Sequence, residues 1–274
     1  MLRTSLLLLS LALPVTVAAA PLSPIAEGVE YGTYEPSPGD VFHVVRVDPK
    51  RAQLVAKMSS VDGAGPRTLR TWCDDQRLLA GINLGMYMDD HRRNVGHATA
   101  HGHANQSRWN PQYQSVLVWD PKRPGLPAAA IVDRDSDGAT ARIGEYRNAV
   151  QNLRLIKHPG QNVWTEQPRK WSESAIASDG EGRILFIFAK RGHAMTEFNR
   201  LLLGLPLGVV AAMHVEGGPE ASLCVRGGKA VDLWGSFETG FFPRDDNARQ
   251  WEIPNVLGVI AKPSVPLKKS APTK

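Results

Sequence analysis

Cysteine is scarce in this 274-residue chain, which contains only Cys73 and Cys224. No cysteine lies near the amino-terminal segment "MLRTSLLLLSLALPVTVAAAPLSP", which excludes lipid attachment there, and the chain has neither paired cysteines nor an HExxH pattern for zinc. It also lacks internal repeats, low-complexity tracts and basic runs interleaved with aromatic residues. These absences argue against a nucleic-acid-binding protein and favour an ordinary globular domain.

The first 20 residues have the features of a secretory signal peptide: one arginine, a leucine-rich core and a tail of small residues. The apolar core is too short for a comfortable membrane span, and Pro14 interrupts it. Removing the leader takes away Arg3, so the formal net charge falls from +5 to +4. We therefore expect a periplasmic or secreted protein without a membrane span after cleavage. Such a compartment permits a disulfide between Cys73 and Cys224, but the sequence leaves their pairing open.

Apolar runs bounded by turn residues predict more strands than helices. Strands are expected within 41–58 (two, with a turn at 48–50), 80–83, 115–119, 128–132, 149–156, 173–189 (a hairpin), 207–215 and 222–234 (a hairpin). Helices are expected at 67–79, with Leu79 on the apolar face, and at 195–205, with Thr196 as the cap. This order predicts a mixed α+β fold: a single domain over 21–262, with a large, mostly hairpin-connected mixed sheet flanked by helices. A proline- and lysine-containing tail is expected over 263–274.

Polar residues with catalytic potential follow two of the expected strands. "MHVEGGPEASL" places Glu216 directly before Gly217 and Gly218, and glycine pairs permit positive φ or close approach to another group. "AGINLGMYMDD" places Asn83 at a strand end, followed by Tyr87 and Asp89. Each pattern alone is more typical of a turn than of a functional site.

The stretch "HRRNVGHATAHGHANQS" contains four histidines, the commonest transition-metal ligand. It is also compatible with a strand, a turn at His101-Gly102 and a second strand, in which the histidines only alternate along the surface. No metal ligands are predicted from it. No cofactor is identified, and a requirement for a divalent cation is left open.

Two carboxylates, Glu173 before one strand and Glu216 after another, are candidates for a pair at one sheet edge. Glycoside cleavage requires such a pair, one to protonate the leaving oxygen and one to activate water or attack the anomeric carbon. The sequence alone does not bring them together.

These stretches, in this order, resemble the phosphodiester glycosidase family. "AGINLGMYMDDHRRNVG", "HATAHGHANQS" and the long segment from "SAIASDG" to "VEGGPEASL" are similar to successive parts of its members, and the similarity runs from about Gly28 to Gly258. The resemblance implies an α/β domain with a long sheet and hydrolysis of a sugar-1-phosphodiester or a related cell-envelope glycan bond.

The resemblance also implies the site. Asn83 matches the family asparagine and Glu216 the family aspartate, so both are predicted to be catalytic. Gly217 and Gly218 match its two glycines and would let the sugar or phosphate approach the backbone. The substrate-binding residues predicted around them are Tyr87, Asp89, Glu173 and Glu220.

Three departures from the family pattern bear on its activity. Glu216 stands where members have aspartate, Glu173 lies where many have an arginine that could clamp a phosphate, and Glu220 replaces a common serine. A glutamate at position 173 would repel a phosphate. Two hypotheses follow: an exported glycosidase acting on a carbohydrate or sugar phosphate, and a catalytically inactive relative that binds envelope glycan.

Overall fold

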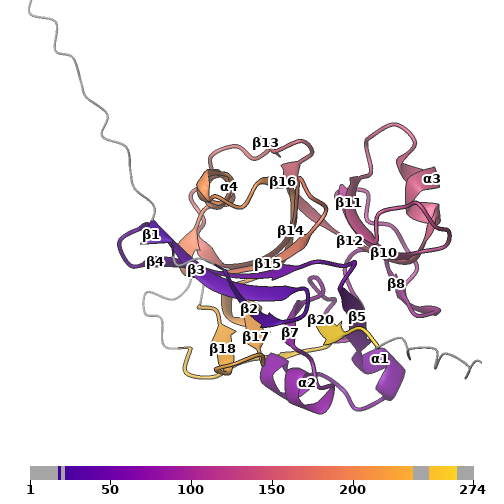
Figure 1. Ribbon diagram of the computed structural model, residues 1–274, viewed down its shortest axis with the longest axis horizontal. Helices are drawn as coiled ribbons and strands as arrows, with labels where there is room; N and C mark the ends of the chain where they lie inside the picture. The colour runs from indigo at the N-terminus through magenta and orange to yellow at the C-terminus, as the bar shows by residue number, and fades with distance from the viewer. Residues whose placement is uncertain (1–17, 20–21, 237–246, 264–274) are drawn as a thin grey trace, which may run out of the picture.

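The computed structural model describes residues 18–19, 22–236 and 247–263. Within these residues two antiparallel β-sheets face each other and helices cover their outer sides (Figure 1). The larger sheet runs in the order β1-β3-β4-β15-β14-β16-β12-β10-β11, with β2 on β3, β8 and β13 on β12, and β9 on β8. Its 13 strands are β1 (Ala18–Ala19), β2 (Ser23–Ala26), β3 (Val29–Ser37), β4 (Asp40–Val47), β8 (Ala98–Ala100), β9 (His103–Gln106), β10 (Ser115–Pro121), β11 (Ala129–Asp133), β12 (Tyr146–Lys157), β13 (Gln161–Asn162), β14 (Trp171–Asp179), β15 (Ile184–His193) and β16 (Val209–Gly217).

The smaller sheet has five strands in the order β18-β17-β7-β20-β5. These are β18 (Val231–Trp234), β17 (Ser222–Val225), β7 (Ala80–Asn83), β20 (Asn255–Ala261) and β5 (Ala52–Met58). A separate pair joins β6 (Arg67–Thr68) to β19 (Glu252–Ile253). The helices are α1 (Ser59–Asp62), α2 (Leu69–Asp75), α3 (Ala139–Gly144), α4 (Met195–Gly204) and the short 3₁₀ turn η1 (Gly218–Glu220).

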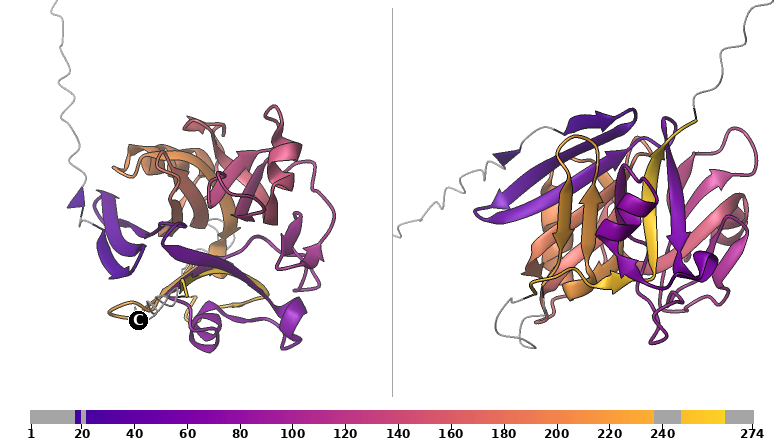
Figure 2. Two further views of the ribbon diagram at one scale, coloured as in Figure 1. Left: turned by 45° about the vertical axis from the view of Figure 1, so that its right-hand side comes forward. Right: turned by 90° about the horizontal axis from the view of Figure 1, so that it is seen from below.

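The main core lies between the two sheets, and alternation along β15 shows how the layers form. Phe186 and Phe188 pack into this inner core, while Leu185 and Ile187 face the other way, toward α4. Successive strand side chains point to opposite faces, so a strand buried on both sides is apolar throughout. The layered arrangement is visible in Figure 2.

The hairpin between β14 and β15 forms where the sequence predicts it. The Oδ1 atom of Asp179 accepts hydrogen bonds from the backbone N–H groups of Glu181 and Arg183, each at 2.9 Å. Gly182 has a φ of 79°, a conformation that glycine adopts without steric penalty. The turn therefore fixes the register of the two central strands.

Cys73 and Cys224 form a disulfide that ties α2 to the smaller sheet, with their Cα atoms 6.8 Å apart. Gly81 on β7 lies against it: a Cβ atom at this position would come within 2.9 Å of Cys73 Sγ and 3.2 Å of Cys224 Sγ. The glycine is needed here because the two sulfurs occupy the space of a side chain.

The predicted fold class, a single domain of large sheets with few helices, is confirmed. Two local predictions are wrong. Helix α2 ends at Asp75, before Leu79, because the Leu79 N–H donates to the Val259 carbonyl of β20 instead. Thr196 does not cap α4: Ala194 occupies the cap position, and the Thr196 hydroxyl donates to the Trp164 carbonyl at 3.2 Å.

The turn expected at 48–50 is present, but the strands it joins enter different sheets: β4 pairs with β3 and β15, whereas β5 pairs with β20. Most of the predicted leader and nearly all of the predicted tail lie outside the described residues. In the described part of the chain, no helix is long and apolar enough to cross a membrane.

Candidate active site

Strand β16 carries the "HVEGG" segment to the edge of the larger sheet and contains a bulge just before its end. Ser174 of β14 pairs with Glu216, whereas the next residue, Ala175, pairs with His214, so Val215 is an extra residue in β16. Bulges re-aim side chains and recur beside active sites. The 3₁₀ turn η1 follows at once, and its first residue, Gly218, has a φ of 65°.

A buried pair of titratable side chains joins β14 to β16. Nδ1 of His214 lies 2.5 Å from Oε1 of Glu173, and the two residues are only 4% and 1% exposed. The Trp171 indole N–H donates to the other carboxylate oxygen at 3.1 Å. Burial raises the pKa of Glu173. Burial lowers the pKa of His214, but the adjacent Glu173 carboxylate raises it more, so its net shift is upward.

The surroundings of the Glu216 carboxyl perturb its pKa strongly. Burial raises its pKa, His214 lowers it and repulsion from Glu220 raises it further, to about 8. Glu216 is therefore mostly protonated at neutral pH. A carboxylic acid in this state can donate a proton to a leaving oxygen.

Two tyrosines complete this acidic centre, which we define as Glu216, Glu220, Tyr87, Tyr113 and His214. Burial, then repulsion from Glu220 and Glu216, raises the pKa of Tyr87. Burial and repulsion from Glu216 raise the pKa of Tyr113 to about 12. Both phenols thus remain neutral hydrogen-bond donors near the carboxyl groups.

Asn83 connects the smaller sheet to the turn that carries the acidic centre. Its amide oxygen accepts from the Ser222 N–H at 2.8 Å and from the Ser174 hydroxyl at 3.1 Å, and its amide nitrogen donates to the Glu220 carbonyl at 3.0 Å. The Ser174 hydroxyl also lies 3.1 Å from the Glu216 carbonyl. Asn83 is 2% exposed, so this geometry suits the positioning of the turn.

Five of the predicted site residues fall into three groups. Glu216, Glu220 and Tyr87 are brought together, whereas Asp89 is exposed in the turn beyond Tyr87 and lies outside the acidic centre. Glu173 is buried behind His214, so its carboxylate does not face a substrate phosphate as the sequence interpretation assumed.

The two glycines have separate physical roles. A Cβ atom at Gly217 would lie 2.5 Å from the Trp171 ring, so the space that this glycine leaves is filled by the protein itself. At position 218 the backbone has a positive φ, which glycine adopts without steric penalty. Close approach of a sugar to Gly218 stays a prediction.

The histidine-rich stretch forms the strand, turn and strand expected of its alternative interpretation, β8 and β9, with His101 at a φ of 52°. His97 stacks on Trp109 with ring centroids 4.1 Å apart, and His103 bonds the Ser60 hydroxyl. No cluster of three or more potential metal ligands occurs among the described residues.

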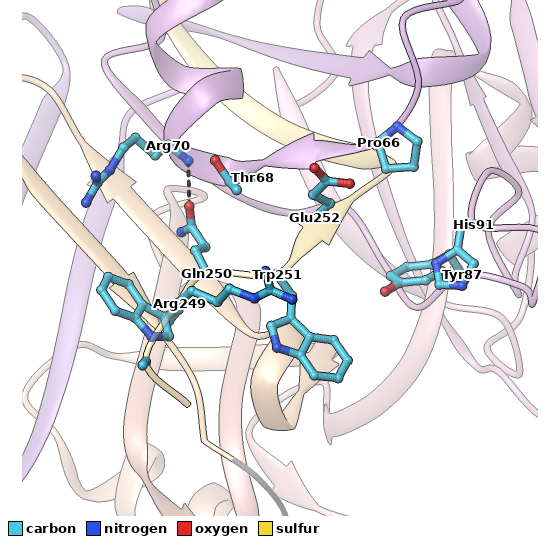
Figure 3. A pocket seen from close by; sticks show the side chains of 11 residues that line it. Pro66, Thr68, Arg70, Tyr87, His91, Arg249, Gln250, Trp251 and Glu252 are labelled. Carbon is cyan, nitrogen blue, oxygen red and sulfur yellow. Dashed lines mark hydrogen bonds between the residues drawn. The ribbon is translucent and has the colours of Figure 1, made fainter. Parts of the chain in front are cut away.

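A hollow of about 940 Å³ opens beside the acidic centre, and Tyr87 and His91 form part of its wall (Figure 3). The rings of these two residues lie 5.3 Å apart. Trp234 also lines the hollow and pairs with Ser222, two residues after Glu220, so the hollow lies next to the turn that carries Glu220.

Three functional candidates were missed from the sequence: His214, Trp171 and Tyr113. His214 lies two residues before Glu216, and the period of a strand places such residues on one face, so a signal existed. Trp171, two residues before Glu173, had the same signal. Tyr113 lies in a loop with no pattern that points to the site.

Paired carboxyl groups with one protonated at neutral pH are typical of glycoside hydrolases. The phosphodiester glycosidase family model matches residues 76–260, and the chain belongs to this family. Among curated proteins, no sequence is similar enough to count as a relative.

Solved structures share the fold at low sequence identity. The catalytic domain of zebrafish N-acetylglucosamine-1-phosphodiester alpha-N-acetylglucosaminidase, auto-inhibited by its pro-peptide, aligns with a TM-score of 0.59 and 12% identity over 89% of this chain and 87% of that one. A hypothetical protein from Synechocystis aligns with a TM-score of 0.58 and 17% identity over 86% of this chain and 62% of that one. A putative exported protein from Burkholderia pseudomallei aligns with a TM-score of 0.50 and 11% identity over 85% and 74% of the two chains.

Proposed function

We propose that this protein hydrolyses a sugar-1-phosphodiester, or a related cell-envelope glycan bond, at the acidic centre. The observation that carries the proposal is the position of Glu216, a carboxyl group protonated at neutral pH at the exit of β16, beside Glu220. Family membership supports glycosidase chemistry, and the positions of the side chains support the roles that we propose for them.

Glu216 acts as the general acid and Glu220 as the base that activates water. Two carboxyl groups close together cannot both ionise easily, so one proton stays on the pair. Glu216 gives this proton to the oxygen between the anomeric carbon and phosphorus as the carbon–oxygen bond breaks. Water adds to the anomeric carbon and loses a proton to Glu220, which leaves a free sugar and a phosphate monoester.

The Glu173–His214 pair and Asn83 hold this centre in place. Glu173 fixes the orientation of the imidazole through Nδ1, as carboxylates do for catalytic histidines. Within the described residues, Nε2 of His214 has no hydrogen-bond partner, so it can bind a substrate oxygen. Asn83 acts as a positioning residue through the backbone of Glu220 and Ser222.

The proposal places the protein in the periplasm or outside the cell. Its support is the disulfide between Cys73 and Cys224, since such bonds persist in oxidising compartments, together with the leader predicted from the sequence.

The test is hydrolysis of an N-acetylglucosamine-1-phosphodiester, followed as release of free sugar. Glu216→Gln should lower kcat by about 10²-fold or more, the usual contribution of a general acid. Glu166→Gln, which changes an exposed glutamate outside the acidic centre, is the matched control and should retain activity. Equal activity in the parent and in Glu216→Gln would refute the assigned role.

The alternative is a catalytically inactive relative that binds glycan. It is favoured by the three glutamates, Glu173, Glu216 and Glu220, that stand where the chain differs from the family pattern. It predicts no turnover by parent or variants across a broad panel of phosphodiesters and envelope glycans. It also predicts glycan binding that persists in Glu216→Ala.

A further inference from the structure

The hollow beside the acidic centre is built from two walls. Tyr87 and His91 stand on one side, and Arg249 and Trp251, from the segment leading into β19, stand on the other (Figure 3). A cavity of about 940 Å³ has room for a sugar unit and its phosphate. Aromatic walls with a few charged groups are typical of small-molecule sites.

Arg249 is a cation of this hollow that no carboxylate of the described residues neutralises. Arg70, which also lines it, is bound to Asp232 through Nε at 3.0 Å. Arg249, by contrast, has neither a hydrogen-bond nor an ion-pair partner among the residues that the structure describes. Glu252 is the carboxylate on the same wall, and it forms no ion pair with Arg249. Arginine binds phosphate through two parallel N–H donors, so an unpaired guanidinium suits a phosphate oxygen pair.

Trp251 provides an aromatic surface in the same wall. It is 37% exposed although it is a large apolar residue. The apolar face of a sugar ring packs on an indole ring, which offers a large, flat apolar surface.

Two lining residues place the hollow beside the chemistry: Tyr87 belongs to the acidic centre, and Trp234 pairs with Ser222, two residues after Glu220. We propose that the hollow is the leaving-group subsite, in which Arg249 binds the phosphate and Trp251 packs on the sugar ring that carries it. This inference rests on the proposed function, because only that reaction defines a leaving group. The subsite selects leaving groups that contain a sugar ring over simple alkyl groups, and it supplies an arginine, which the acidic centre lacks.

The test compares two substrates that share one sugar-1-phosphate, a methyl ester and a hexosyl ester. Trp251→Ala should lower kcat/KM for the hexosyl ester by about 10-fold and change the methyl ester less than about 2-fold. Arg249→Ala should lower kcat/KM for both by about 10-fold or more, because both contain the phosphate. Trp109→Ala removes a tryptophan of similar exposure, 39%, outside the hollow and should change neither substrate.

A second arm measures binding without turnover. A hexose phosphate is titrated calorimetrically into the parent protein, with methyl phosphate and inorganic phosphate as probes. We expect the hexose phosphate to bind more tightly than methyl phosphate, an advantage lost in Trp251→Ala, and all three ligands to weaken in Arg249→Ala. If these binding results were obtained but no substrate were hydrolysed, the proposed reaction would be refuted and the subsite would still be supported. Binding unchanged by both substitutions, or equal loss of both esters in Trp251→Ala, would overturn the subsite.

Discussion

Replacing Glu216 by glutamine should stabilise the fold in a pH-dependent way while it removes activity. The folded protein raises the pKa of this carboxyl from 4.5 to about 8. Between these values the folded state holds a proton that the unfolded state has lost. The stability of the parent protein is therefore full below pH 4.5 and falls as the pH rises toward 8. Glutamine does not titrate, so the variant escapes this loss.

The magnitude follows from the size of the shift. Each pKa unit corresponds to about 1.4 kcal/mol, so the advantage of Glu216→Gln should grow by up to about 4 kcal/mol between pH 5 and pH 8. Glu216 keeps part of its surface exposed, and solvent there screens the charge, so we expect a measured growth of about 1–4 kcal/mol.

The assay is urea unfolding at pH 5 and pH 8 with the disulfide intact, analysed by linear extrapolation. Glu166→Gln, at an exposed position, serves as the control and should differ from the parent by the same small amount at both pH values. A Glu216→Gln advantage that is equal at the two pH values, or smaller at pH 8, would refute the burial of a protonated carboxyl at this position.

Three further predictions address the supports of the site. Asn83→Ala should lower the free energy of unfolding by about 1–3 kcal/mol, because it removes three hydrogen bonds and leaves the buried Ser222 N–H without a partner; a loss below about 0.5 kcal/mol in urea would contradict this. Replacing Cys73 and Cys224 together by serine should cost about 2–5 kcal/mol, and an unchanged urea midpoint would show that the bond does not support the fold. His214→Gln removes the charge that lowers the pKa of Glu216, so the alkaline limb of kcat/KM should move to higher pH; movement to lower pH would be inconsistent with this electrostatic coupling.

Most strands were predictable because their apolar runs and turns are local features. The hairpin of β14 and β15 followed from two apolar runs around Asp179-Gly180-Glu181-Gly182. The choice of sheet was not predictable: β4 and β5 are consecutive, yet they pair with strands more than 130 residues further along the chain. The Thr196 hydroxyl was misassigned for the same reason, since its partner, Trp164, belongs to another segment.

The residues at the strand ends of the candidate site were predictable, whereas the buried contacts behind them were not. Glu216 and Asn83 stood out because each follows a buried strand. The sequence could not show that Glu173 turns inward onto His214, since this depends on the register of β14 and β16 and on the bulge at Val215.

The most direct test of the central claim is which bond the protein breaks. An N-acetylglucosamine-1-phosphodiester is hydrolysed in ¹⁸O-labelled water, and the released phosphate monoester is examined by ³¹P NMR. Cleavage between the anomeric carbon and oxygen, as a glycosidase requires, predicts a monoester without label. Incorporation of ¹⁸O into the phosphate would show attack at phosphorus and contradict the account.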